Sequence, residues 1–210
     1  LIPNEVLVIT CGVDVQGDRL EAQVIGWGHN NEAWVLDYKI FFGDPSSGLV
    51  WKDLDKYLNG FYIREDNKKL RINCSCIDSG GHHTQQVYAF CKTRTHRKIY
   101  AIKGQSQSNK PIAGRPSYIG RARNILFPVG ADTAKEFIYS RLKAEEETIH
   151  FPATVDEEYF MQLTAEKRII KYVKGRKKFE WVKKNTRNEA LDTFVYALAG
   201  LYILQPNYNK

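Results

Sequence analysis

Nearly continuous apolar segments open the chain and predict its first strands. Residues 5–15 (EVLVITCGVDV) are rich in β-branched side chains, which is typical of a central strand covered on both faces. Turn residues at 16–18 lead into a second strand over Leu20–Gly28, and Asn30-Asn31 leads into a third over Ala33–Phe42. The pattern therefore predicts an antiparallel meander of three strands at the start of the fold.

Helical and strand-like periods alternate from about residue 49 onward. Apolar residues from Val50 to Phe61 recur at helical spacing. Further helices are expected over residues 84–92, 133–143 and 156–163, and further strands over residues 71–77, 98–102 and 124–129. This alternation implies parallel pairing of the later strands. Asp132 is expected to cap the helix that follows it, and the acid-free segment Lys103–Asn124 is expected to be a long loop.

Two strands and a long helix are predicted to end the chain. Residues 167–173 and 179–183 form a ribbon, in which aromatic side chains are expected to pack inward while lysine and arginine face outward. An apolar helix follows over residues 188–204. Because 210 residues fit one domain, we expect a single α/β domain over residues 1–210, with a mixed sheet flanked by helices.

Positive charge is concentrated in the second half of the chain. The formal net charge is +7, whereas residues 1–100 carry 12 basic and 12 acidic side chains. This polarity favours a polyanionic partner, and the alternative is a solvated basic face without one. No apolar run approaches the ~18 residues of a membrane-spanning helix, so no membrane partner is expected. The four cysteines lack the spacing of a zinc site and are typical of a reduced, intracellular protein.

Three aspartates stand in apolar surroundings, where carboxylates are costly. Asp14 lies inside the first predicted strand, Asp78 follows the strand over residues 71–77, and Asp192 lies in the final helix. A buried arginine partner, a turn or a polar helix edge would explain each one alone. Together they supply the oxygen ligands that Mg²⁺ and Mn²⁺ prefer. Two such ions ~3.5–4 Å apart can clamp a phosphodiester, so the three acids and the basic second half indicate a nuclease.

Basic and histidine side chains are candidates for contacting DNA or assisting the chemistry. The segment from Glu166 to Arg187 holds ten basic and two acidic residues, which suits a duplex backbone, and the alternative is a solubilising edge. His82 and His83 follow the Asp78 turn and are auxiliary candidates for orienting water or protonating a leaving oxygen, or are simply solvated. The positions expected to contact DNA are Lys103, Arg115, Arg121, Arg123, Lys174, Arg176, Lys177 and Lys178.

Several short blocks, taken together, resemble one protein family. The order of elements, with one aspartate after a strand and another in the last helix, resembles the ribonuclease H-like fold. More narrowly, nearly the whole chain resembles the nuclease domain of phage terminase large subunits of the lambda-like GpA type. The blocks that carry this resemblance are Gly12-Val13-Asp14-Val15-Gln16, Asp18-Arg19-Leu20-Glu21, Cys76-Ile77-Asp78-Ser79-Gly80, Ala101-Ile102-Lys103-Gly104, Gly130-Ala131-Asp132-Thr133-Ala134-Lys135, His150-Phe151-Pro152 and Asn188-Glu189-Ala190-Leu191-Asp192.

The resemblance implies a metal-dependent DNA endonuclease that cuts concatenated viral DNA during genome packaging. Two Mg²⁺ or Mn²⁺ ions are implied, with Asp14 bridging both and with Asp78 and Asp192 each completing one site. Glu189 departs from this three-acid scheme. It is either an extra ligand or, as we prefer, a partner of the helix dipole in the first turn of the final helix.

The resemblance also implies partners and a location. These are double-stranded DNA, an ATPase domain upstream in the same chain, a small terminase subunit and the portal protein, all in the host cell cytoplasm. The chain carries no GxxxxGK[ST] phosphate loop, so the ATPase half is expected outside these 210 residues.

Two other functions stay open from the residues alone. One is a transposase or junction resolvase on the same fold, and the other is a non-catalytic nucleic-acid-binding module. Metal-dependent nicking of plasmid DNA would separate the enzymes from the binding module.

Overall fold

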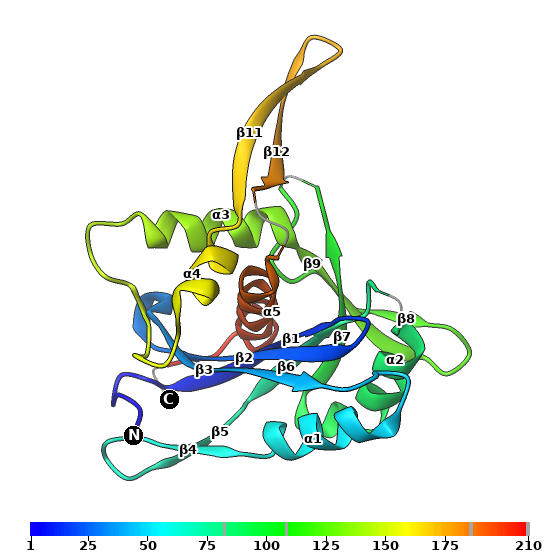
Figure 1. Cartoon of the computed structure of the whole chain (residues 1–210), viewed down its shortest axis with the longest axis vertical. Coiled ribbons are helices and arrows are strands. Elements are labelled where there is room, and N and C mark those ends of the chain that lie inside the picture. Colours follow the sequence, from blue (N-terminus) through cyan, green and yellow to red (C-terminus); the bar gives the residue numbers. More distant parts are fainter. Residues whose placement is uncertain (82, 108, 185–186, 209–210) are drawn as a thin grey trace.

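A mixed sheet forms the centre of the protein, as the computed structural model in Figure 1 shows. The structure describes residues 1–81, 83–107, 109–184 and 187–208. Within these residues, eight strands hydrogen-bond in the order β10-β3-β2-β1-β6-β7-β9-β8. Their bounds are β1 Val8–Val15, β2 Arg19–Trp27, β3 Ala33–Phe42, β6 Cys74–Asp78, β7 Ile99–Gln105, β8 Ser117–Ile119, β9 Asn124–Gly130 and β10 Ile149–His150.

The strand directions confirm the predicted mixed sheet. β1, β2 and β3 are antiparallel neighbours, joined by short turns. β1, β6, β7 and β9 run parallel to one another. The edges hold two strands that the sequence pattern did not predict: β8 pairs antiparallel with β9, and the two-residue β10 pairs parallel with β3.

Helices cover both faces of this sheet (Figure 1). α3 (Ala131–Leu142), α4 (Glu157–Leu163) and α5 (Glu189–Leu204) pack in one core, and α1 (Gly48–Leu58) and α2 (Thr84–Lys92) pack in another on the opposite face. The 3-10 turns η1 (His29–Asn31) and η2 (Thr95–Arg97) connect elements. Because β1 lies between the two cores, its buried positions are continuous, as its apolar sequence predicted. Within the described part of the chain, no helix is long and apolar enough to cross a membrane.

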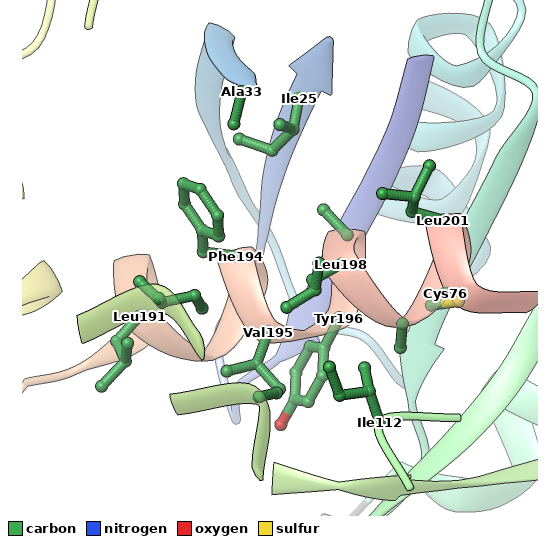
Figure 2. Close-up of a cluster of buried hydrophobic side chains, with 14 of the residues drawn as sticks. Ile25, Ala33, Cys76, Ile112, Leu191, Phe194, Val195, Tyr196, Leu198 and Leu201 are labelled. Carbon is green, nitrogen blue, oxygen red and sulfur yellow. The ribbon is translucent and has the colours of Figure 1, made fainter. Parts of the chain in front are cut away.

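The last helix, α5, lies directly on the central strands, and Figure 2 shows its side chains filling the space around it. Its residues are buried from Glu189 through Leu201 with the exception of Asp192. The close approach requires a glycine, because a Cβ on Gly12 of β1 would lie 1.9 Å from the carbonyl oxygen of Thr193. Thr10 Oγ1 donates to the carbonyl oxygen of Ala197 at 2.6 Å and fixes the register of the helix along β1.

Several predicted boundaries differ from the structure for local reasons. The first helix ends at Leu58, so Phe61 belongs to the hairpin of β4 (Phe61–Ile63) and β5 (Lys69–Arg71). The predicted loop 103–124 is shorter, because β7 continues to Gln105 and β8 lies within it. Asp132 does not cap its helix, since α3 begins at Ala131 and Gly130 occupies the capping position.

A two-stranded ribbon, β11 (Glu166–Val173) and β12 (Arg176–Lys183), extends away from the body of the molecule (Figure 1). Its turn contains only Lys174 and Gly175, both with positive φ, so the strands are longer than predicted. The four ribbon cations predicted to contact DNA, Lys174, Arg176, Lys177 and Lys178, therefore do not share one face. Lys177 lies opposite Tyr172 and shares its face of the ribbon. Its neighbours along β12, Arg176 and Lys178, point to the other face.

Candidate active site

Two of the predicted aspartates lie near the carboxyl ends of neighbouring parallel strands. β1 and β6 pair in parallel with Val13 opposite Ile77, so Asp14 and Asp78 occupy the next position on each strand. Carboxyl ends of strands are where ligands gather in open α/β sheets. Asp14 is 5% exposed and Asp78 is half-buried. Both carboxylates therefore lie side by side at the carboxyl ends of two paired strands.

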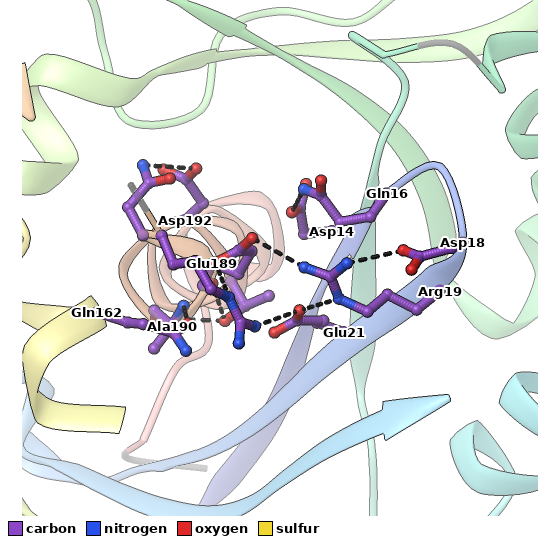
Figure 3. A network of polar contacts seen from close by, with 12 residues as sticks. Asp14, Gln16, Asp18, Arg19, Glu21, Gln162, Glu189, Ala190 and Asp192 are labelled. Carbon is purple, nitrogen blue, oxygen red and sulfur yellow. Dashed lines mark hydrogen bonds and ion pairs between the residues drawn. The ribbon is translucent and has the colours of Figure 1, made fainter. Parts of the chain in front are cut away.

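The third aspartate reaches the same edge from the first turn of α5. The glycine contact at Gly12 brings the helix onto β1, and Asp192 lies one residue before Thr193, which makes that contact. Figure 3 shows Asp192 and Glu189 of the helix near Asp14 of β1. The three predicted acids thus come from two strands and one helix and converge on one region.

Burial and mutual repulsion set the electrostatics of these acids. Burial raises the pKa of Asp14 to about 6, and the charges of Asp78 and Glu189 contribute in the same direction. Burial raises the pKa of Asp192 to about 7, opposed by Lys135 and reinforced by Asp14. The pKa of Asp78 is also raised by burial, although backbone N–H groups of Ser79 and Gly80 and the charge of Lys103 lower it. Such clustered, perturbed carboxylates are typical of functional sites.

Each aspartate accepts a hydrogen bond from a donor of its own. Gln16 Nε2 donates to Asp14 Oδ2 at 2.5 Å, the backbone N–H of Gly80 donates to Asp78 Oδ1 at 3.0 Å, and Asn188 Nδ2 donates to Asp192 Oδ2 at 2.9 Å. In this arrangement, no three acidic, histidine or cysteine side chains among the described residues are positioned to hold one metal ion. The donor set is nevertheless all carboxylate oxygen, which is the chemistry that hard divalent cations require.

A polar network supports Asp192 from the side of α3 and the ribbon. Lys135 Nζ lies 2.8 Å from Glu166 Oε2 and 4.0 Å from Asp192 Oδ1. Asn188 Nδ2 also donates to Glu166 Oε1 at 2.8 Å, and Lys183 Nζ donates to Asn188 Oδ1 at 2.6 Å. The carboxylates of Glu166 and Asp192 therefore share one lysine and one amide.

A second network fixes the start of α5 against β2. Figure 3 shows Arg19 between Asp18, Glu21 and Glu189, and its guanidinium lies 2.6 Å from Glu21 Oε1 and 3.1 Å from Glu189 Oε1. Arg187 Nη2 lies 2.8 Å from the same Glu21 oxygen. Glu189 thus stands in the first turn of α5, where the helix dipole favours an acid, and its carboxylate is engaged by two arginines.

Lys103, predicted to contact DNA, and the auxiliary candidate His83 have different surroundings. Lys103 is exposed on β7, beside the strand that carries Asp78, and its charge lowers the pKa of that carboxyl. His83 occupies the N-cap position of α2. His82 lies outside the described residues.

The remaining cations predicted to contact DNA are all exposed. Arg115 precedes β8, and Arg121 and Arg123 lie in the turn between β8 and β9. On the ribbon, Lys174 lies in the turn, and Arg176, Lys177 and Lys178 lie on β12. The two groups belong to different projections of the molecule, the β8–β9 hairpin and the ribbon (Figure 1).

Sequence reasoning missed the residues that hold the acids in place. Asn188 stands four residues before Asp192, and this helical spacing was a usable signal. No sequence signal pointed to Lys135 and Glu166, because they are 31 residues apart and meet only through the packing of α3 beside the ribbon. Likewise, the pairing of Arg187 with Glu21 spans 166 residues.

Comparison with known proteins places the chain in a family. The family model described as "Terminase large subunit gpA, endonuclease domain" matches residues 1–210. The chain is 38% identical over 212 residues to the terminase large subunit of Escherichia phage lambda, covering 96% of this chain and 33% of that protein. It is 35% identical over 215 residues to the terminase large subunit of Enterobacteria phage P21, with the same coverage. The protein therefore belongs to the family of terminase large subunit gpA endonuclease domains, as its short blocks indicated.

The chain spans about a third of the length of these curated relatives. Among solved structures, it is similar to the nuclease domain of the large terminase subunit gp2 of bacterial virus Sf6. A mutant of that domain with manganese and beta-thujaplicinol gives a TM-score of 0.54 at 11% identity, covering 93% of this chain and 89% of that chain. Another structure of the domain gives 0.50 at 9% identity with the same coverage. The likeness confirms the predicted ribonuclease H-like fold.

Proposed function

We propose that this chain is a divalent-metal-dependent endodeoxyribonuclease. The observation that carries the proposal is the convergence of Asp14, Asp78 and Asp192, all with raised pKa values, at the carboxyl edge of the sheet. Asp14, Asp78 and Asp192 would together hold two Mg²⁺ or Mn²⁺ ions through their carboxylate oxygens. The manganese bound by the similar domain of Sf6 gp2 supports a cation of this kind.

When bound, such ions supply activation of a water molecule and stabilisation of charge on the phosphodiester oxygens. The protein must then hold three carboxylates in their charged form. The ammonium of Lys135 favours the charged form of Asp192, and Asn188 orients that carboxylate through a hydrogen bond at 2.9 Å. Lys103, exposed beside Asp78, is suited to bind a phosphate near the cut.

In the whole protein, we propose that the domain cuts concatenated viral DNA during genome packaging, in the cytoplasm of the host cell. The family supports this role, and so do the exposed cations of the ribbon and of the β8–β9 hairpin. The partners would be double-stranded DNA, an ATPase domain of the same polypeptide, the small terminase subunit and the portal protein. The domain itself would extend over residues 1–210 as one unit.

Plasmid nicking tests the proposal. The purified chain should convert supercoiled plasmid to open-circle and linear forms with Mn²⁺ and not with EDTA. Asp14→Asn, Asp78→Asn and Asp192→Asn should each reduce the rate at least a hundredfold. Asp53→Asn, on the exposed side of α1 across the sheet, should cut like wild type. A variant of the three that cuts at near wild-type rate under saturating Mn²⁺ would remove that residue from the site.

A further inference from the structure

The ribbon exposes apolar and aromatic side chains that have no place in the core. Tyr172 is 75% exposed, Ile170 is 50% exposed and Phe179 is 36% exposed. These side chains are too large to be left in water without a reason on an element that already carries many charges. Lysine and arginine alone would be enough to keep the ribbon soluble or to bind duplex phosphates. The exposed rings therefore require a separate explanation.

The strand register gathers these side chains on one face. Ile170 lies opposite Phe179, and Tyr172 lies opposite Lys177. The predicted inward packing of the aromatics is therefore wrong for most of the ribbon, since only Trp181, near the root, packs against the body, with its ring 5.0 Å from that of Tyr139. The outer part of this face, formed by Ile170, Tyr172, Lys177 and Phe179, is here called the aromatic face.

Cations are interleaved with the rings of the aromatic face. The guanidinium of Arg168 lies 3.9 Å from the ring centre of Phe179, and the ammonium of Lys177 lies 5.2 Å from it. The only acidic side chain on the ribbon beyond its first residue is Glu180, which lies on the opposite face and pairs with Lys171 at 2.8 Å. A partner of the aromatic face must therefore present both negative charge and flat apolar surfaces.

Single-stranded DNA meets both requirements, and an intact duplex meets only one. In a duplex the faces of the bases are covered by their neighbours, whereas unpaired bases can stack on aromatic rings while the backbone binds nearby cations. We propose that the aromatic face of the ribbon binds DNA with unpaired bases, with Tyr172 as the principal stacking platform. This deepens the proposed function, because it names the form of DNA that the ribbon holds, and it rests on DNA being the substrate.

The root of the ribbon connects this surface to the candidate active site. Glu166, the first residue of β11, contacts Lys135 and Asn188, the same groups that contact Asp192. Arg168 lies 3.0 Å from Glu136 of α3, which anchors the stacked arginine to the body. Tyr172 lies six residues beyond Glu166, about 20 Å along the strand. A DNA strand that stacks on Tyr172 is therefore held within one ribbon length of the three aspartates.

Fluorescence anisotropy in EDTA, which prevents cutting, tests the proposal. A labelled 20-nucleotide single strand and a duplex of the same length would be titrated with the whole chain over a salt series. We expect Tyr172→Ala to weaken single-strand binding by about 5- to 100-fold with an unchanged salt slope, because stacking releases no counterion. Duplex binding should change less than twofold. Tyr172→Phe should restore single-strand binding, since it keeps the ring.

Two control variants sharpen the result. Phe61→Ala removes a ring that is 51% exposed on β4, in a hairpin outside the surfaces proposed to contact DNA, and should leave both affinities unchanged. Lys177→Ala should reduce the salt slope for both forms of DNA. Equal weakening of single-strand and duplex binding by Tyr172→Ala would overturn the proposal in favour of a duplex-groove contact. No change in either would overturn it in favour of a protein partner for the ribbon.

The failure of this inference is distinguishable from that of the nuclease assignment. Plasmid nicking with Mn²⁺ would be measured on the same preparations. A chain that does not nick DNA, but whose single-strand binding depends on the ring at residue 172, would refute the nuclease assignment and support the ribbon inference. A chain that nicks DNA with a Tyr172-independent single-strand affinity would do the reverse.

Discussion

Asp14 is almost completely buried, yet within the described residues its hydrogen-bond donor is an amide and not a cation. Gln16 Nε2 donates to it, while the nearby guanidinium of Arg19 is directed at Asp18, Glu21 and Glu189. A buried carboxylate without a charge partner is unfavourable when ionised. The energetic cost at this position is therefore largest in the absence of a cation and at neutral pH.

This cost predicts a pH dependence of stability. The pKa of Asp14 rises to about 6 on folding, so the native state binds this proton more tightly than the unfolded state does. The stabilising contribution is complete below the unfolded pKa of about 3.9 and disappears as the pH rises through about 6. In EDTA, wild type should lose about 1 kcal/mol of unfolding free energy from this group between pH 5 and pH 7.5.

The measurement is urea denaturation at both pH values, with Asp14→Asn as the test and Asp53→Asn as the control. Asp14→Asn should show a shallower loss and should be at least as stable as wild type at pH 7.5. Asp53→Asn should follow wild type. Identical pH profiles for wild type and Asp14→Asn would show that burial does not raise the pKa of Asp14.

At the scale of elements, the contact between β1 and α5 positions the site. α5 can carry Asp192 to the edge of the sheet only because Gly12 has no side chain in its path. The positions of the three acids could be predicted approximately from the sequence, whereas this contact could not. Periodicity identified both strands and the helix, and the strand ends indicated the edge, whereas the depth of the contact depends on a backbone-to-backbone approach that no hydrophobic pattern encodes.

Gly12→Ala should therefore damage stability and cutting together. The new Cβ would meet the backbone of Thr193 and Ala197, which cannot give way like a flexible side chain. We expect a loss of roughly 2–3 kcal/mol in unfolding free energy, as for other overpacked cores. Gly17→Ala is the matched control, since its Cβ would have nothing within 4 Å. Equal stabilities of the two variants in urea would mean that α5 can shift without cost.

The ribbon shows where prediction from sequence failed at this scale. Its existence and its charge followed from alternation and composition. Its length did not, because Arg176, Lys177 and Lys178 resemble a solvated loop, yet a two-residue turn at Lys174 and Gly175 lets pairing continue to the tip. The face of each aromatic side chain depends on that register, so a misplaced turn also misplaced the aromatics.

At the scale of the whole molecule, cation binding should couple to folding. Ions that bind only the native state stabilise it by roughly 2.7 kcal/mol at a hundredfold excess over Kd. Millimolar Mn²⁺ should accordingly raise the Tm of wild type by about 5–10 °C for a chain of this size. Asp14→Asn should show a much smaller rise.

Differential scanning calorimetry with and without Mn²⁺ would measure these shifts. Asp53→Asn serves again as the control and should show the full shift of wild type. Equal shifts in wild type and Asp14→Asn would place the bound cation elsewhere on the molecule. EDTA should return the wild-type Tm to its metal-free value.

The dependence of the site on both β1 and α5 has a consequence during protein synthesis. Asp14 leaves the ribosome before Asp192, which is encoded 178 positions later. A nascent or prematurely terminated polypeptide therefore possesses two of the three carboxylates and lacks the helix that covers them. On the proposed function, the complete set of three carboxylates would exist only after translation has passed the final helix, so shorter products would lack the capacity to cut DNA.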